Sequence, residues 1–232
     1  MATGHTVKAF DHDLDQLRAS IAEMGGLAEN AIGESMRALM QRDTEAALRV
    51  VENDRKIDAL EAEVERNAVQ IIALRAPMAD DLRDVVAALK IAGVVERIGD
   101  YAKNIAKRVR VIEESPNIEP LSLLPEMARI AAEMVHNVLD AFAARDADKA
   151  VAVCERDRAV DDFYNSIFRT LLTFMMENPH NITPATHLLF IAKNLERIGD
   201  HATNVAEMVY FAATGEHLAE RSRGVDPIGP DA

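Results

Sequence analysis

Acidic side chains recur at a fixed spacing in two places along this chain. Glu96 and Asp100 lie four residues apart in the segment Glu-Arg-Ile-Gly-Asp, and the same five residues recur with Glu196 and Asp200. On a helix this spacing places both carboxylates of a pair on one face. Their oxygens suit hard or borderline cations such as Mg²⁺, Mn²⁺, Ca²⁺ or iron. One such pair is common on solvated helices, so a single copy would predict little.

A second pair of carboxylates precedes each copy. Asp54 and Asp58 precede the first, and Asp157 and Asp161 precede the second, again four residues apart. If each pair faces its partner across two antiparallel helices, at least four carboxylates come together. Like charges at this spacing repel by a few tenths of a kcal/mol. We therefore expect cations, bound protons or basic neighbours to offset the repulsion. The basic neighbours of the first copy are Arg55, Arg97 and Lys103.

The doubled pattern predicts two metal sites built from carboxylates. The candidate ligands are Asp54, Asp58, Glu96 and Asp100 in the first site, and Asp157, Asp161, Glu196 and Asp200 in the second. The two copies are not identical, since Glu61 and Glu65 of the first correspond to Tyr164 and Phe168 of the second. We expect the second site to be less acidic and to differ in the ions it binds.

The elements that would carry these residues are long helices. Apolar or small residues at alternating spacings of four and three, from Phe10 to Ala38, predict the first helix. Asp43 is a candidate N-cap for the second. Repeating this reasoning along the chain predicts six helices at about 10–41, 44–74, 79–113, 123–145, 147–177 and 184–214. The fold class is therefore all-α.

The six helices form two groups of three. The only prolonged break in the helical pattern is Ser-Pro-Asn-Ile-Glu-Pro at 115–120, and after it the residue pattern of the first half repeats. Short connections favour antiparallel neighbours. We predict two tandem three-helix bundles related by internal duplication, at 1–116 and 117–215, and a disordered tail at 216–232.

Net charge, cysteine count and the length of apolar runs restrict the kinds of partner and cell compartment expected for this protein. The formal net charge of −13 argues against nucleic acid and anionic membrane surfaces as partners. The single cysteine, Cys154, cannot form an internal disulfide and falls in an apolar helical pattern, so we expect it in the core. The first residues lack the apolar run of a signal peptide, and no run approaches the length of a membrane span. We expect a cytoplasmic protein without membrane insertion.

The doubled motifs resemble those of the PhoU family. The second-helix motif is Asp54-Arg-Lys-Ile-Asp58 in the first copy and Asp157-Arg-Ala-Val-Asp161 in the second, where Val160 replaces Ile. The third-helix motif, Glu-Arg-Ile-Gly-Asp-x-x-x-Asn, runs from Glu96 to Asn104 and recurs at 196–204. The resemblance covers roughly residues 10–214.

This resemblance implies a non-catalytic cytoplasmic regulator of phosphate uptake that forms a homodimer. Its implied partners are the ATPase subunit of the phosphate importer and a sensor histidine kinase, and its implied effect is to keep phosphate-starvation genes repressed when phosphate is plentiful. The resemblance also implies metal clusters at the acidic motifs, with iron, zinc, manganese or magnesium as the candidate ions.

Two other hypotheses explain the same residues. A carboxylate-bridged metal enzyme could use such clusters, although the paired motifs lack histidine and no nucleophile motif or phosphate-binding loop occurs. Alternatively, the chain is a helical adaptor without metal, and its carboxylates bind a basic surface of a partner. Metal analysis of the purified protein separates these hypotheses.

Overall fold

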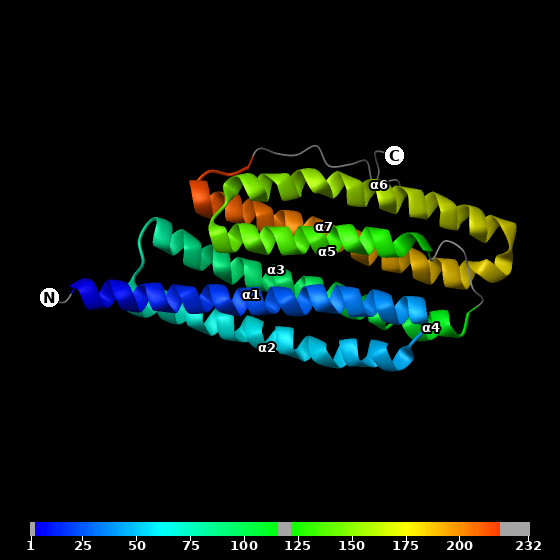
Figure 1. Ribbon diagram of the computed structural model, residues 1–232, viewed down its shortest axis with the longest axis horizontal. Coiled ribbons are helices and arrows are strands. Elements are labelled where there is room, and N and C mark those ends of the chain that lie inside the picture. Colours follow the sequence, from blue (N-terminus) through cyan, green and yellow to red (C-terminus); the bar gives the residue numbers. More distant parts are fainter. Residues whose placement is uncertain (1–2, 116–121, 219–232) are drawn as a thin grey trace.

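The protein is built from long helices, as seen in a computed structural model that describes residues 3–115 and 122–218 (Figure 1). The helices are α1 (Thr3–Gln41), α2 (Thr44–Arg75), α3 (Asp80–Ala106), α4 (Val109–Glu113), α5 (Leu124–Ala144), α6 (Ala147–Glu177) and α7 (Ile182–Thr214). A 3-10 turn, η2 (Pro179–Asn181), precedes α7. Within the described ranges there is no strand, which confirms the all-α prediction.

Most helix boundaries agree with the sequence-based prediction, and the main difference is in the third helix. The predicted helix at 79–113 is divided into α3 and α4 by a turn at Lys107 and Arg108. At this turn the Arg108 amide donates to the carbonyl of Ile105, three residues back, at 3.0 Å. The prediction of one unbroken helix was therefore wrong here. The backbone hydrogen bond at Arg108 spans three residues, as in a 3-10 helix, instead of the four of an α-helix.

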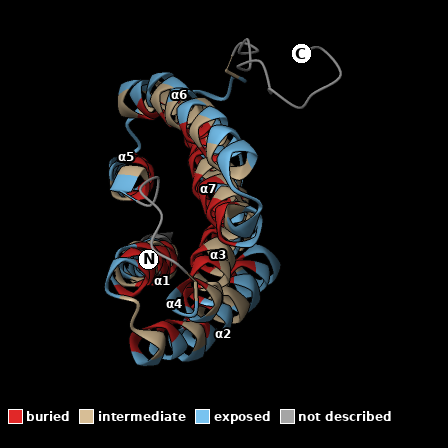
Figure 2. Ribbon diagram, turned by 90° about the vertical axis from the view of Figure 1, so that its right-hand side faces the viewer, coloured by how far each residue is buried: buried red, intermediate tan, exposed pale blue. Residues whose placement is uncertain are grey.

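The helices pack as two three-helix bundles that share one interior. α1, α2 and α3 contact one another, as do α5, α6 and α7, and the bundles meet where α3 packs on α7 and α1 packs on α5. Figure 2 shows α6, α7, α3 and α2 in one curved layer, with α5 and α1 covering its concave side. The prediction of tandem bundles from duplication is confirmed.

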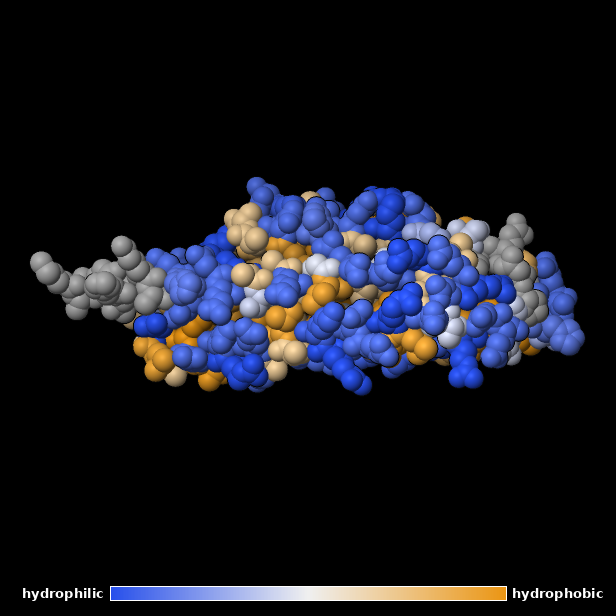
Figure 3. Space-filling view, turned by 60° about the horizontal axis from the view of Figure 1, so that its bottom comes forward, coloured by the Kyte–Doolittle hydropathy of each residue, from blue (hydrophilic) through white to orange (hydrophobic). Residues whose placement is uncertain are grey.

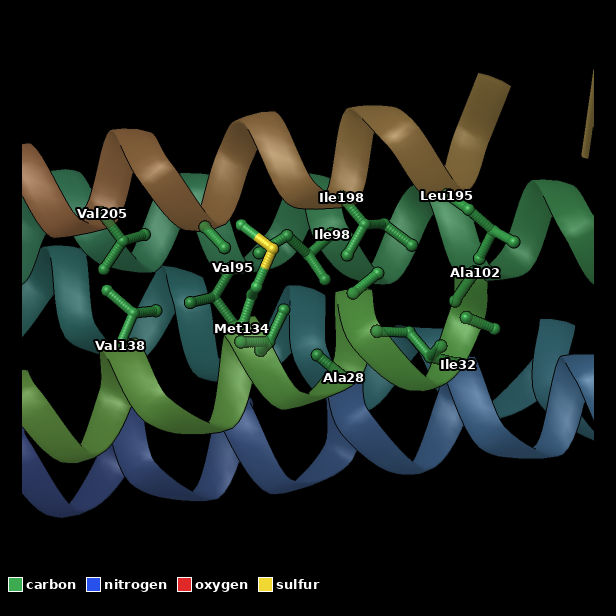
Figure 4. Close-up of a cluster of buried hydrophobic side chains, with 14 of the residues drawn as sticks. Ala28, Ile32, Val95, Ile98, Ala102, Met134, Val138, Leu195, Ile198 and Val205 are labelled. Carbon is green, nitrogen blue, oxygen red and sulfur yellow. The ribbon is translucent and has the colours of Figure 1, made fainter. Parts of the chain in front are cut away.

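The core lies between the α3–α7 pair and the α1–α5 pair (Figure 4). Side chains from all four helices meet there, and the labelled ones include Ile32, Ile98, Met134 and Ile198. All four are almost completely buried. Ile98 and Ile198 belong to the two copies of Glu-Arg-Ile-Gly-Asp, so the core holds each copy through its central isoleucine. Cys154 is buried, as expected from its apolar surroundings.

Parts of the sequence-based organisation lie outside the described residues. The segment 116–121, which contains most of the predicted break between the bundles, and residues 219–232 of the predicted tail are not described. The boundaries 1–116 and 117–215 stay predictions.

The surface mixes charged residues with exposed apolar ones. In Figure 3 hydrophobic surface gathers at the left end of the molecule, the end where α2 turns into α3 in Figure 1. The exposed apolar residues at this end include Leu74 and Met78, and Val69 lies further back on α2. None of the helices in the described ranges combines the length and hydropathy required to span a membrane.

Candidate functional site

The acidic residues of the first half converge between α2 and α3. Asp54, Asp58 and Glu61 lie on α2, and Glu96 and Asp100 lie on α3; we call these five residues the first cluster. Burial raises the pKa of Glu96, and repulsion from Asp100, Glu61, Asp58 and Asp54 adds to the rise. The carboxylates therefore lie close enough to interact electrostatically, as the helical spacing predicted.

Gly99 allows the two helices of the first cluster to approach closely. A Cβ atom at this position would lie 2.8 Å from Ile57 Cδ1 and 3.3 Å from Asp54 Oδ1. Ile57 is almost fully buried beneath the cluster, between the two aspartates of its own motif. The glycine in the middle of α3 is thus explained by packing, and its small size places the Asp54 carboxylate against the α3 backbone.

Lys103 brings a positive charge between the two helices of the first cluster. Its Nζ donates hydrogen bonds to the carboxylates of Asp54 on α2 and Asp100 on α3. Burial lowers the pKa of Lys103, but the bonds to these two aspartates outweigh that effect and hold the pKa above its ordinary value. Burial also raises the pKa of Asp58, with further repulsion from Asp54. The ammonium therefore offsets part of the repulsion, as one of the basic neighbours named from the sequence.

The second cluster has the same arrangement on α6 and α7. We define it as Asp157 and Asp161 on α6 with Glu196 and Asp200 on α7. Gly199 repeats the role of Gly99, since a Cβ there would lie 3.1 Å from Asp157 Oδ1. The structure therefore places the eight acidic residues selected from the sequence on two pairs of packed helices, four on each pair.

Glu196 is the most deeply buried of the motif glutamates. Its side chain is 12% exposed, and burial raises its pKa although Lys193 Nζ donates to its Oε1 at 2.7 Å. Its other oxygen, Oε2, is buried and has no hydrogen-bond partner. A buried carboxylate oxygen without a partner is costly, and this one would be satisfied by a cation or a proton.

Two aromatic residues, Tyr164 and Phe168, stand in the second half where the first half has Glu61 and Glu65. Tyr164, which takes the position of Glu61, is buried, and its ring centroid lies 5.0 Å from Lys193 Nζ and 6.5 Å from the ring of Phe168. Aligning the two halves of the sequence identified these aromatic residues but not the role of Lys193. The signal was present, because Lys193 precedes Glu196 by three residues and so lies on the same helix face.

The donor chemistry of both clusters fits a hard cation. Each cluster offers carboxylate oxygens from two helices. In the second cluster, the buried Glu196 Oε2 accepts no hydrogen bond from the protein. In the conformation described for residues 3–115 and 122–218, no three His, Cys, Asp or Glu side chains are grouped as a ready-made metal site. The clusters are therefore oxygen-rich surfaces rather than closed coordination shells.

Sequence reasoning missed a buried ion-pair network away from the clusters. Asp84 of α3 is almost fully buried, and its Oδ2 accepts from Arg18 Nη2 at 3.1 Å and from Arg145 Nη1 at 2.8 Å. The same Arg145 donates to the carbonyl of Ala212 at 3.1 Å. Asp84 looks like an ordinary acid in the first turns of a helix, so nothing local in the sequence marks it.

Comparison with known proteins places these features in context. A family model described as the PhoU domain matches the chain twice, at residues 21–109 and 124–209. The chain is 60% identical over 228 residues to a phosphate-specific transport system accessory protein PhoU homolog of Zymomonas mobilis, covering 98% of this chain and 96% of that protein. A homolog of the same description from Caulobacter vibrioides is 46% identical over 227 residues, covering 97% and 99%.

Two crystal structures are similar to this fold. PhoU from Pseudomonas aeruginosa has a TM-score of 0.86 and 36% identity, covering 89% of this chain and all of that one. The phosphate transport system regulatory protein PhoU from Streptococcus pneumoniae has a TM-score of 0.84 and 27% identity, covering 91% of this chain and all of that one. Each of the two matched regions of the family model contains one acidic cluster.

Proposed function

Because the chain belongs to the PhoU family, we propose that it regulates phosphate uptake and phosphate-starvation signalling. The observation that carries this proposal is the double match to the PhoU domain, together with relatives described as accessory proteins of phosphate-specific transport. The protein acts in the cytoplasm as a homodimer and catalyses no reaction. It contacts the ATPase subunit of the phosphate importer and a sensor histidine kinase.

Exposed apolar residues at the ends of the helical hairpins support action by protein contact. At the α2–α3 turn they include Leu74 and Met78, which are 68% and 80% exposed. At the α6–α7 turn they include Met176, 80% exposed, and Ile182, 49% exposed. Such residues grouped on a surface are typical of protein-binding sites. Met is well suited to this role because its flexible side chain adapts to different partners.

The acidic clusters bind metal ions in this proposal, with iron, zinc, manganese or magnesium as candidates. Asp54, Asp58, Glu96 and Asp100 would hold an ion in the first cluster, and Asp157, Asp161, Glu196 and Asp200 in the second. A bound cation supplies charge neutralisation between carboxylates, not catalysis. The residues on neighbouring helices orient the oxygens, so a cation would join α2 to α3 and α6 to α7 and stiffen the surface that meets partners.

The regulatory role is tested in cells. Deletion of the gene should leave an alkaline-phosphatase-type starvation reporter switched on in high phosphate, and the intact gene supplied in trans should restore repression. A reporter that stays repressed in the deletion strain would contradict the proposed role.

The metal part is tested on the isolated protein. Elemental analysis of protein purified without chelator should find metal in the wild type and much less in an Asp100→Asn/Asp200→Asn variant. Negligible metal in both samples would contradict the proposal that the clusters bind metal. It would favour the alternative of a helical adaptor whose carboxylates bind a basic surface of a partner.

A further inference from the structure

A row of arginines and aromatic rings lies along the contact between α3 and α7. The Arg108 guanidinium is 4.4 Å from the centre of the Phe190 ring, and the Arg197 guanidinium is 5.8 Å from the centre of the Tyr101 ring. The Tyr101 ring also meets the His201 ring edge to face, with 5.1 Å between their centres. Each contact joins α3, or the turn after it, to α7. Because a cation is attracted to the face of an aromatic ring, these contacts hold the arginines in place.

Arg97 extends this row. It is the residue that the duplication relates to Arg197, and it lies one helical turn before Tyr101, on the same face of α3. Burial lowers the pKa of His201, and the positive charges of Arg97 and Arg197 lower it further, so both guanidiniums lie near that ring. We call the six residues the arginine strip: Arg97, Tyr101, Arg108, Phe190, Arg197 and His201.

The arginine strip faces solvent, and its charges are not paired. Arg97 and Arg197 are exposed, and Phe190 is 50% exposed. Across residues 3–115 and 122–218, none of the three guanidiniums of the strip forms an ion pair with a carboxylate. Arg108 donates instead to the ring nitrogen of His187, and its Nε is buried without a hydrogen-bond partner. The strip can therefore bind an anionic group through charge-assisted hydrogen bonds.

The two acidic clusters flank the arginine strip. The first cluster lies on α2 and α3 and the second on α6 and α7, and the helices of the curved layer follow the order α6, α7, α3, α2 (Figure 2). Packed helices are about 8–10 Å apart, so the clusters lie within about one Debye length of the strip at physiological salt. A wide polyanion, such as nucleic acid or an anionic bilayer, would be repelled by both clusters. A second copy of the chain, docked about a two-fold axis through the strip, would bring arginine against arginine.

From this charge pattern we propose that the arginine strip is the docking surface for a short acidic segment of a partner protein. The inference rests on the proposed function only in that the protein acts through protein contact. Arg97 and Arg108 are eleven residues apart, which corresponds to about 16 Å along a helix. A segment with several Asp or Glu residues matches this length, whereas a single small anion would reach only part of it. Basic side chains beside those acids would meet the two clusters, and this complementarity fixes the register of the segment.

The test places p-benzoylphenylalanine at position 190 of the full chain, in place of Phe190, and cross-links it with light in the cells that express the protein. The cross-linked peptide should belong to another protein and carry several Asp and Glu residues. Arg97→Gln/Arg197→Gln should lower the cross-link yield by at least ~10-fold, because one charge-assisted hydrogen bond already corresponds to that change in affinity. Arg66→Gln/Arg169→Gln is the matched control and should keep the wild-type yield, because it removes two exposed arginines of α2 and α6 that the duplication also relates.

Binding of a synthetic peptide provides a second readout that needs no variant of the protein. The cross-linked segment is made as a fluorescent peptide, and its binding to the purified wild-type protein is measured by fluorescence anisotropy. A version with Asn and Gln in place of its Asp and Glu should bind at least ~10-fold more weakly. Equal binding of the two peptides would overturn the inference.

Other results of the cross-linking would also overturn the inference. These are no cross-link from position 190, a cross-link to a second copy of this chain or to a segment without carboxylates, and equal loss of yield in the two double variants. The starvation reporter in the same cells judges the proposed function separately. A reporter regulated as proposed, without any cross-link, rejects the docking surface alone. An acidic cross-link in a strain whose gene deletion leaves the reporter repressed rejects the proposed function alone.

Discussion

Gly99 and Gly199 determine how closely the paired helices approach beneath each cluster. At Gly99 the nearest atoms are Ile57 Cδ1 and Asp54 Oδ1, and at Gly199 they are Asp157 Oδ1 and the methyl groups of Val160. In both halves an acidic oxygen and a buried aliphatic side chain fill the space that a methyl group would need. The glycine of each Glu-Arg-Ile-Gly-Asp segment is therefore a packing residue that also positions the first aspartate of the neighbouring helix.

We predict that Gly99→Ala destabilises the protein. Alanine gains about 1 kcal/mol in helix propensity, but its Cβ would lie 2.8 Å from the buried Ile57, and overpacking costs about 1–3 kcal/mol. The expected net loss is about 1 kcal/mol, measured by urea unfolding. Gly26→Ala is the control, because no atom lies within 4 Å of its added Cβ; it should stabilise by about 0.5–1 kcal/mol. Equal effects of both variants would refute the packing role.

His187 links the start of α7 to the turn between α3 and α4. Arg108 Nη1 donates to its Nδ1 at 3.2 Å, and the Arg108 guanidinium lies 4.4 Å from the centre of the Phe190 ring. Burial lowers the pKa of His187, and the positive charge of Arg108 lowers it further. The folded protein thus favours the neutral imidazole, which can accept the hydrogen bond from Arg108.

This lowered pKa predicts a loss of stability in mild acid. A histidine with a lower pKa in the folded state binds fewer protons there, so its contribution is complete above the unfolded value of about 6.5 and is lost as the pH falls below it. His187→Gln should therefore lose less stability than the wild type between about pH 7.5 and about pH 5.5 in urea unfolding. The exposed His180→Gln should lose as much as the wild type. An undiminished loss in His187→Gln would contradict this assignment.

At the scale of elements, the turn between α1 and α2 has the same conformation as the turn between α5 and α6. α1 and α5 each end at an arginine in the left-handed conformation, Arg42 with φ 55° and Arg145 with φ 53°. The next residue in each case is an aspartate that caps the following helix: Asp43 accepts from the Ala46 amide at 2.8 Å, and Asp146 from the Lys149 amide at 2.9 Å. The duplication therefore preserved local backbone geometry as well as the acidic motifs.

Loss of either cap should weaken the helix that it begins. Asp43→Ala leaves the Ala46 amide without its side-chain acceptor and should cost about 1 kcal/mol. Asp43→Asn should retain most of the stability, since asparagine caps comparably well. Asp146→Ala should behave like Asp43→Ala if the two turns are equivalent. Thermal or urea unfolding measures all three, and an Asp43→Ala variant as stable as Asp43→Asn would argue against capping.

Across the whole molecule, Asp84 joins parts that are remote in the sequence. It accepts from Arg18 on α1 and from Arg145 after α5, and Arg145 also holds the carbonyl of Ala212 near the end of α7. Burial raises the pKa of Asp84, and the guanidinium groups of Arg145 and Arg18 counter this rise. The residue equivalent to Asp84 in the second half is Pro184, so the duplication does not preserve this connection between the bundles.

Asp84→Asn should loosen the two bundles from each other. Removing one member of a buried ion pair costs about 3–5 kcal/mol. Because Arg18 and Arg145 retain 26% and 38% exposure, we expect a smaller loss of about 2 kcal/mol, measured by urea unfolding. Asp80→Asn is the matched control, because Asp80 pairs with Arg83 at the exposed start of the same helix and such pairs contribute about 0–1 kcal/mol. Similar losses in the two variants would show that the network is not important.

Much of the architecture follows from local patterns in the sequence. The caps at Asp43 and Asp146 and the heptad spacing of α1 are properties of neighbouring residues, so helix positions could be predicted closely. The same periodicity placed the carboxylates on shared helix faces. The turn at Lys107 and Arg108 could not be predicted, because both residues are good helix formers.

The sequence by itself determined the all-helical class, the duplication and which carboxylates share a helix face, because each depends on spacing along the chain. Only the tertiary structure decided how each cluster is neutralised. Lys103 reaches Asp54 across the α2–α3 contact, Lys193 serves Glu196 beside Tyr164, and Asp84 binds arginines from two other segments. Charge balance depends on distances between separate helices and on exclusion of water, and neither is encoded in a local pattern.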